Sequence, residues 1–66
     1  MAARFEIEVR ADNGEFYWHL RSDNNRIIAR SAETFKAKTT CIDELTEIRE
    51  RAAEISVVDK TGAPST

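Results

Sequence analysis

The sequence predicts an α+β fold in which a three-stranded antiparallel meander carries one amphipathic helix packed on one face. Two observations indicate the sheet. Two runs of alternating apolar and polar residues meet at the pair Asn13-Gly14, and a cluster of turn-forming residues follows the second run. A third observation indicates the helix, because from about Lys38 onward apolar residues recur at steps of four and three.

The first hairpin is predicted from Asn13-Gly14, since both residues accept the positive φ of a two-residue type I′ turn. One face would then pair Ala11–Phe16, Val9–Trp18, Ile7–Leu20 and Phe5–Ser22, and the other Arg10–Tyr17, Glu8–His19, Glu6–Arg21 and Arg4–Asp23. The first set is nearly all apolar, and most pairs of the second set join opposite charges. We therefore expect strands over residues 4–10 and 15–21.

A third strand is predicted after the turn formed by residues 23–26, because Asn tolerates left-handed backbone geometry well. With Asn24-Asn25 at the centre of this turn, the expected pairs are Leu20–Ala29 and Ser22–Ile27 inside, and Arg21–Ile28 and His19–Arg30 outside. Since Ile27 and Ile28 are adjacent, one of them must point away from the face that the helix covers.

The helical stripe consists of five residues, widened by Ile42: Cys41, Leu45, Ile48, Ala52 and Ile55. Either Thr39 or Thr40 could supply the N-cap oxygen, with Asp43 and Glu44 placed to interact with the helix dipole. Phe35, in the connection that precedes the helix, is expected to anchor this connection on the edge of the core.

The segment after the helix is short and β-branched, so residues 55–59 could form a fourth strand or an extended arm. Residues 62–66 offer no apolar side chain of any size, and we expect them to form a disordered tail. The chain is thus expected to contain one domain, residues 1–61, followed by this tail.

Composition excludes several classes of function. One cysteine rules out an intramolecular disulfide, and together with a single histidine it argues against a zinc site within one chain. Nothing resembles a signal peptide or a membrane span, so a cytoplasmic location is expected. The net charge of −2 argues against a dedicated nucleic-acid binder. No cofactor and no metal is implied.

The order of these features resembles the YegP-like family of small prokaryotic domains, whose function is not established. The resemblance covers roughly residues 5–59 and rests on the ordered combination of Asn-Gly-Glu, the strand bearing Trp18, Ile27-Ile28-Ala29-x-Ser31, Phe35-Lys36-x-Lys38, Cys41 before an amphipathic helix, and Val57-Val58-Asp59-x-Thr61. Members occur as one repeat or as two in tandem, which implies that a single-repeat chain forms a homodimer. This chain departs from the family pattern at Ala37, where Ser is usual, and at Glu44, where Gly is usual. The resemblance carries no catalytic or ligand-binding residues.

Three side chains could carry chemistry. Cys41 near a helix N-terminus could be a reactive thiolate, but without a histidine partner it is better interpreted as a small buried hydrophobic residue. His19 could be a pH switch, although a surface histidine in a cross-strand charge row explains it more simply. Trp18 alternates in phase with Phe16 and Leu20, which indicates core packing rather than a stacking platform.

The function predicted first is a non-catalytic structural or interaction module that acts as a homodimer. No paired carboxylates with a cleft, no phosphate-binding loop and no nucleophile–base pair are recognisable in the sequence. The candidate interface comprises apolar residues that the core does not need: Ile28, Phe35, Val57 and Val58. The alternative is weak nucleic-acid binding through the outer sheet face, with Arg10, Tyr17, His19, Arg21 and Arg30.

Overall fold

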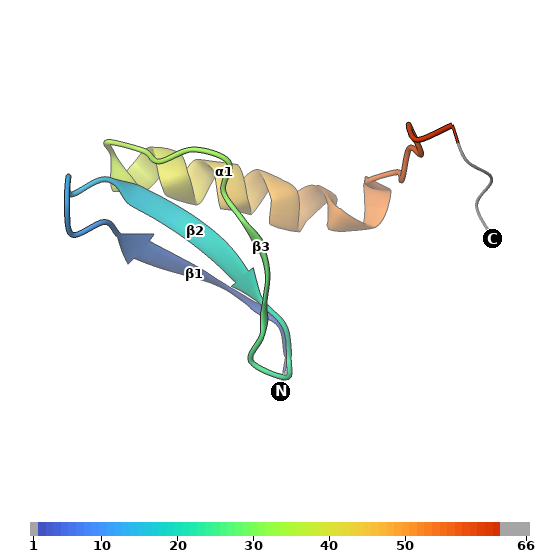
Figure 1. The fold of residues 1–66 in the computed structure, drawn as a ribbon, viewed down its shortest axis with the longest axis horizontal. Coiled ribbons are helices and arrows are strands. Elements are labelled where there is room, and N and C mark those ends of the chain that lie inside the picture. The colour runs from blue at the N-terminus through green and yellow to red at the C-terminus, as the bar shows by residue number, and fades with distance from the viewer. Residues whose placement is uncertain (1, 63–66) are drawn as a thin grey trace.

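The computed structural model describes residues 2–62 and contains one sheet and one helix (Figure 1). The strands are β1 (Arg4–Val9), β2 (Phe16–Arg21) and β3 (Ile27–Arg30), all antiparallel in the order β1-β2-β3. Helix α1 (Lys38–Arg51) continues into one 3-10 turn, η1 (Ala52–Glu54). The predicted α+β class, the three-stranded meander and the single helix are confirmed.

The first hairpin has a longer loop than Asn13-Gly14 suggested, so the predicted register is wrong by two residues. Val9 lies opposite Phe16, Ile7 opposite Trp18, Phe5 opposite Leu20, Glu8 opposite Tyr17, Glu6 opposite His19 and Arg4 opposite Arg21.

In the loop, Arg10 N donates to Glu15 O at 2.8 Å and Gly14 N donates to Arg10 O at 2.9 Å. Gly14 has a φ of 70°, whereas Asn13 does not take positive φ and instead accepts a hydrogen bond from Glu15 N on its Oδ1. The hydrogen bond to the Asn13 side chain thus holds the loop in a conformation other than a type I′ turn. Because the error is an even number of residues, each side chain keeps its predicted face.

The second hairpin follows the prediction only in part. The pairs His19–Arg30 and Leu20–Ala29 are confirmed, but Arg21 lies opposite Ile27 instead of Ile28. The register shifts between Leu20 and Arg21, as it does at a β-bulge, which places one extra residue on β3. The expected tight turn is present, and Asn25 adopts a left-handed φ of 69°.

The connection between β3 and α1 leaves the sheet and returns to it. Ser31 N still donates to Trp18 O at 2.9 Å, and Phe35 then pairs with Phe16 through two backbone hydrogen bonds of 2.7 Å. Phe35 is half-buried, in agreement with an anchor at the edge of the core. Residues 31–34 form a detour beside β2.

The helix begins at Lys38 as expected, but its cap differs from the prediction. The N-cap is Ala37, which has no side chain able to accept a hydrogen bond from the first turn. Thr39 and Thr40 lie inside that turn, and Asp43 and Glu44 lie beyond it. The predicted threonine cap is therefore wrong, and Asp43 and Glu44 lie beyond the first turn, where the expected interaction with the helix dipole is weak.

The apolar core lies between β2 and the first half of α1. Trp18 and Cys41 are the buried apolar residues of the described part of the chain, and the ring of Phe5 meets that of Trp18 edge-on at 5.3 Å between centroids. Leu45 and Ile48 are only half-buried, and Ile55 is 60% exposed. The stripe is thus covered at one end of the helix and open at the other.

The end of α1 projects beyond the sheet, and the segment after it points away from the sheet (Figure 1). Residues 55–60 form neither helix nor strand, so the possible fourth strand is absent from residues 2–62, and the segment is an arm whose first residue, Ile55, has an extended backbone. The proposed tail beyond Gly62 lies outside the described residues. Within the described residues, no helix is both long enough and apolar enough to cross a membrane.

Candidate functional site

The face of the sheet away from the helix, here called the outer face, is built around one carboxylate. Glu6 Oε1 accepts hydrogen bonds from His19 Nε2 at 2.6 Å and from Arg21 Nε at 3.0 Å, and Glu6 Oε2 accepts one from Arg4 Nε at 2.7 Å. Arg4 and Arg21 are opposite each other in the register, and this like-charge pair is compensated by the carboxylate beside it.

These donors lower the pKa of Glu6 from its ordinary value of 4.5 to about 2, the hydrogen bond from His19 being the largest cause, followed by those from Arg21 and Arg4. Glu6 is therefore ionised near neutral pH and can only accept hydrogen bonds. The proton between Glu6 and His19 consequently resides on His19 Nε2.

His19 is only 6% exposed, so the interpretation of it as a surface histidine is wrong. Its predicted place in a cross-strand charge row is correct, although Glu6 and not Glu8 lies directly opposite. The ring of Tyr17 lies 6.4 Å from that of His19 and shares the outer face with it. Burial on an uncovered sheet face could not be read from strand alternation, which assigns a face but not the packing of neighbouring side chains on that face.

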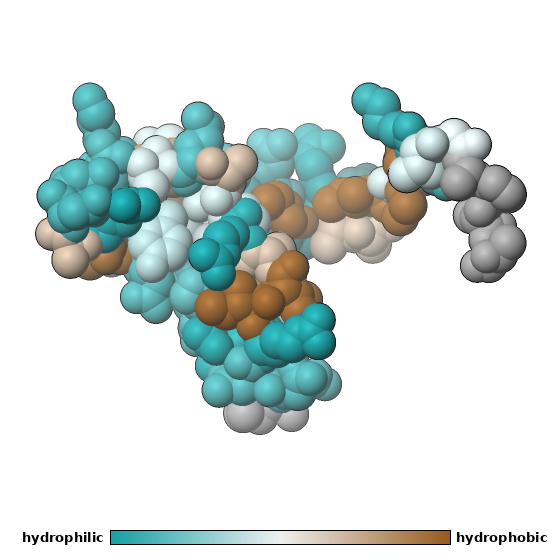
Figure 2. Space-filling model, viewed as in Figure 1, coloured by the Kyte–Doolittle hydropathy of each residue, from teal (hydrophilic) through white to brown (hydrophobic). Residues whose placement is uncertain are grey.

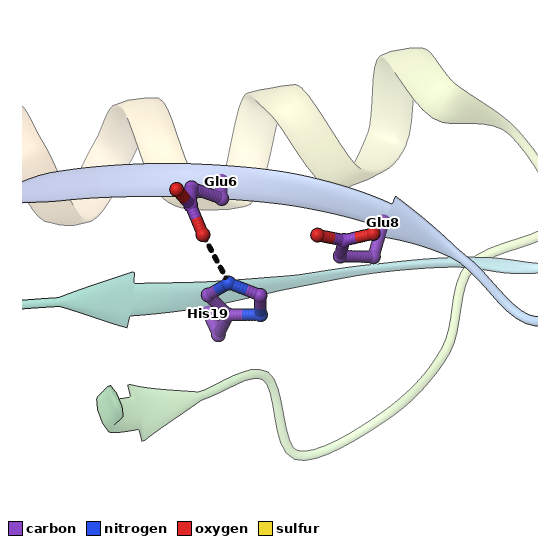
Figure 3. Close-up of side chains that lie close together, drawn as sticks. All are labelled: Glu6, Glu8 and His19. Carbon is purple, nitrogen blue, oxygen red and sulfur yellow. Dashed lines mark hydrogen bonds and ion pairs between the residues drawn. The ribbon is translucent and has the colours of Figure 1, made fainter. Parts of the chain in front are cut away.

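Glu6, Glu8 and His19 also bring three possible metal ligands within 4.8 Å of one another (Figure 3). The donor types would suit a divalent transition metal. However, both oxygens of Glu6 already accept hydrogen bonds from arginines, and a cation would have to displace those bonds next to two guanidinium groups. The contacts favour an ion-pair network over a metal centre.

A hollow of about 940 Å³ lies beside β2, under the detour of residues 31–34. Three of the five residues predicted for nucleic-acid binding line it, namely Arg10, Tyr17 and Arg30. The other two, His19 and Arg21, are held by Glu6 instead. Arg10 is itself bound by Asp12 through two hydrogen bonds of 2.8 and 2.9 Å.

A second depression, here called the helix–sheet groove, lies where α1 diverges from the sheet. It has a volume of about 560 Å³ and is lined by Ala3, Arg4, Phe5, Leu20, Leu45, Ile48, Arg49 and Ala52. Most of this lining is apolar, and the two arginines contribute its charge. The sequence predicted the stripe that forms one wall, but not that its second half would remain uncovered.

Of the four predicted interface residues, the structure leaves three open and partly encloses one. Ile28 is 54% exposed, Val58 is 72% exposed and Val57 is 97% exposed, whereas Phe35 is half-buried against the sheet. Figure 2 shows apolar surface over β3 and, separately, along the part of α1 that extends beyond the sheet. These residues do not meet in one copy of the chain.

Cys41 is fully enclosed at the first turns of α1. Burial raises the pKa of its thiol above the ordinary value, and the nearby charge of Glu44 raises it further. Both effects oppose the thiolate, so the interpretation of Cys41 as a buried hydrophobic residue fits the structure better than a nucleophile.

Comparison with known proteins identifies the class to which this chain belongs. Residues 11–59 match the family model described as a domain of unknown function, DUF1508, and the chain is a member of that family. This confirms the resemblance to YegP-like proteins. No curated protein matches the chain. Among solved structures, it is similar to a protein from Haloferax volcanii whose solution structure was determined by NMR, with a TM-score of 0.75 and 28% sequence identity, over 88% of this chain and 95% of that one.

Proposed function

We propose that this chain is a non-catalytic interaction module that works as a homodimer in the cytoplasm. The observation that carries the proposal is the amount of surface that one copy leaves open. Its accessible area is 5530 Å², against about 4,200 Å² expected of a compact folded chain of its mass. Its radius of gyration is 14.4 Å, against about 11 Å expected for this length.

The excess area is larger than a standard interface requires. It amounts to roughly 1,300 Å² per copy, whereas a standard interface buries about 800 Å² per partner. Among the residues that contribute to it are Ile28, Val57 and Val58, which a second copy could cover. A small domain with so few buried apolar residues gains stability from such pairing.

The proposal is tested by light scattering at two protein concentrations a hundredfold apart. We expect a stable mass near twice that of the 7.5 kDa chain. A mass equal to one chain at both concentrations would overturn the proposal.

A second candidate function, weak nucleic-acid binding, draws support from the hollow lined by Arg10, Tyr17 and Arg30. Two guanidinium groups near one aromatic ring suit a stacked base and its phosphate. Asp12 and Glu33 line the same hollow and oppose this use, as does the net charge of −2.

This candidate is tested by titrating labelled protein with short single-stranded RNA at low salt. Changes in the NMR chemical shifts of Tyr17 and Arg30 that become much smaller as salt is added would support it, since phosphate contacts are salt-dependent. The absence of shifts at both residues would reject it. Dimerisation through apolar surface, in contrast, changes little with salt.

A further inference from the structure

We propose that residues 55–58 of each copy lie in the helix–sheet groove of the other copy. This inference rests on the proposed homodimer and names the surfaces that form it. It assigns an occupant to the groove and a role to the extended arm after α1.

The groove has apolar walls on both of its sides. Phe5 and Leu20 contribute the sheet wall, and Leu45, Ile48 and Ala52 contribute the helix wall. It lies at the part of α1 that has left the sheet, so nothing within residues 2–62 fills it. Side chains this apolar gain free energy when they are removed from water.

The arm offers the complementary surface. Ile55 leaves η1 in an extended conformation, with φ −72° and ψ 122°, and Val57 and Val58 follow. If the arm is seated in the groove as an extended segment, Ile55 and Val57 point to one side and Val58 to the other. The pair Ile55 and Val57 can therefore enter an apolar groove together.

The arm of one copy is not placed to fill its own groove. Ala52 is the last residue of the groove lining, and Ile55 follows only three residues later, at the far end of the helix. From there the chain points away from the sheet (Figure 1). A second copy can supply the same arm from outside, and the exchange is reciprocal, as a two-fold axis requires.

Charge also favours this pairing. The groove carries Arg49 in its lining and also Arg4, whose Nε is already bonded to Glu6, and the arm is flanked by Glu54 on one side and by Asp59 and Lys60 on the other. An arm seated in the groove brings acidic residues toward basic ones at the rim, where complementary charge fixes the orientation of a partner.

The decisive experiment is NMR on a mixture of ¹³C-labelled and unlabelled protein, filtered for contacts between copies. We expect contacts between the Val57 methyl groups of one copy and the side chains of Leu20, Leu45 or Ile48 of the other. A dimeric mass without these intermolecular contacts would overturn the arm exchange and leave the homodimer standing. A monomeric mass would overturn both. Contacts from Val57 to the groove within one copy would also overturn the exchange.

Substitutions provide a second test that does not endanger the fold, because Val57 is almost fully exposed within one chain. Val57→Asp should raise the dissociation constant of the dimer by roughly 100-fold or more, because a two-fold symmetric dimer contains the substituted contact twice. The comparison variant is Ile28→Asp, which tests the other exposed apolar surface open to a second copy, on β3 outside the groove lining. If Ile28→Asp separates the copies and Val57→Asp does not, pairing occurs through β3 and the arm exchange is wrong.

Discussion

Trp18 and Glu44 are joined by a hydrogen bond of 2.7 Å from the indole Nε1 to Oε1, which connects the central strand to the helix. Trp18 is 6% exposed, so its polar N–H has little access to water and depends on this acceptor. Through this bond Glu44 helps to hold α1 on the sheet.

Replacing Glu44 with Ala should therefore destabilise the protein by about 1–3 kcal/mol, because the buried N–H of Trp18 loses its partner. The free energy of unfolding in urea measures this. Glu44→Gln, which keeps an acceptor oxygen, should lose less. As a control, Glu47→Ala on the exposed side of α1 should change stability by less than about 0.5 kcal/mol. Equal losses for Glu44→Ala and Glu47→Ala would contradict the role given to this hydrogen bond.

Because the start of α1 lacks a side-chain cap, we predict that adding one increases the stability of the protein. Ala37→Ser should stabilise the protein by about 1 kcal/mol, because a serine at the N-cap can accept a hydrogen bond from the first helical turn. The midpoint of urea unfolding should rise. Ala32→Ser, in the exposed detour before the helix, serves as the control and should leave the midpoint almost unchanged. A midpoint that is unchanged or lower in Ala37→Ser would contradict the prediction, because the missing cap would then not limit the stability of the protein.

The low pKa of Glu6 predicts how stability depends on pH. Its pKa is about 2 in the folded chain and 4.5 ordinarily, so between these values the unfolded chain binds more protons than the folded one. Stability should therefore fall as the pH is lowered from about 4.5 toward 2. Unfolding free energies measured at several pH values in this window, for the natural chain and for Glu6→Gln, test the prediction. The variant should show a smaller slope, and an identical slope would contradict it.

A direct titration complements that measurement. Arg21→Gln removes the second of the hydrogen bonds that lower the pKa of Glu6, so the pKa of Glu6 should rise, as followed by NMR. Arg26→Gln, in the turn between β2 and β3, is a control of the same charge change. If both variants shift the pKa of Glu6 equally, net charge rather than the hydrogen bond is the cause.

Burial of Cys41 predicts that its thiol is protected in the folded protein. At neutral pH it should react with a thiol reagent far more slowly than the same thiol in urea, and the rate should follow opening of the structure. Since its pKa is raised, stability should also decrease once the pH exceeds the ordinary thiol value of 9.0. Rapid labelling of folded protein, at the rate seen in urea, would show that the helix start is open.

The sequence allowed the fold class to be predicted because periodicity is a local property. Alternation assigned Trp18 to the core and His19 to the opposite face, and both assignments survived an error in the first register, since a slip of two residues preserves the faces. The length of the hairpin loop depended instead on the side chain of Asn13, which bonds to the backbone of Glu15. Turn propensity alone does not reveal such a competing bond.

The candidate site was less accessible to prediction because it depends on contacts between distant parts of the chain. The bond from Trp18 to Glu44 joins residues 26 positions apart, and no pattern in either element announces it. The same holds for the helix–sheet groove. The stripe through Ile48 was recognised, but only its first residue, Cys41, is fully buried, and no local pattern shows where along the helix the burial ends.

The arrangement around Glu6 has a consequence for how the chain tolerates change. One anion serves three cationic or protonated partners, so the network is star-shaped. Losing one outer member leaves the other two bonded to the centre, whereas losing the centre removes the acceptor shared by all three and leaves Arg4 and Arg21 only their hydrogen bonds to Asn25. A library of random substitutions should therefore be depleted more strongly at Glu6 than at Arg4 or Arg21. Within this network, the most constrained position is then one that burial alone would not single out.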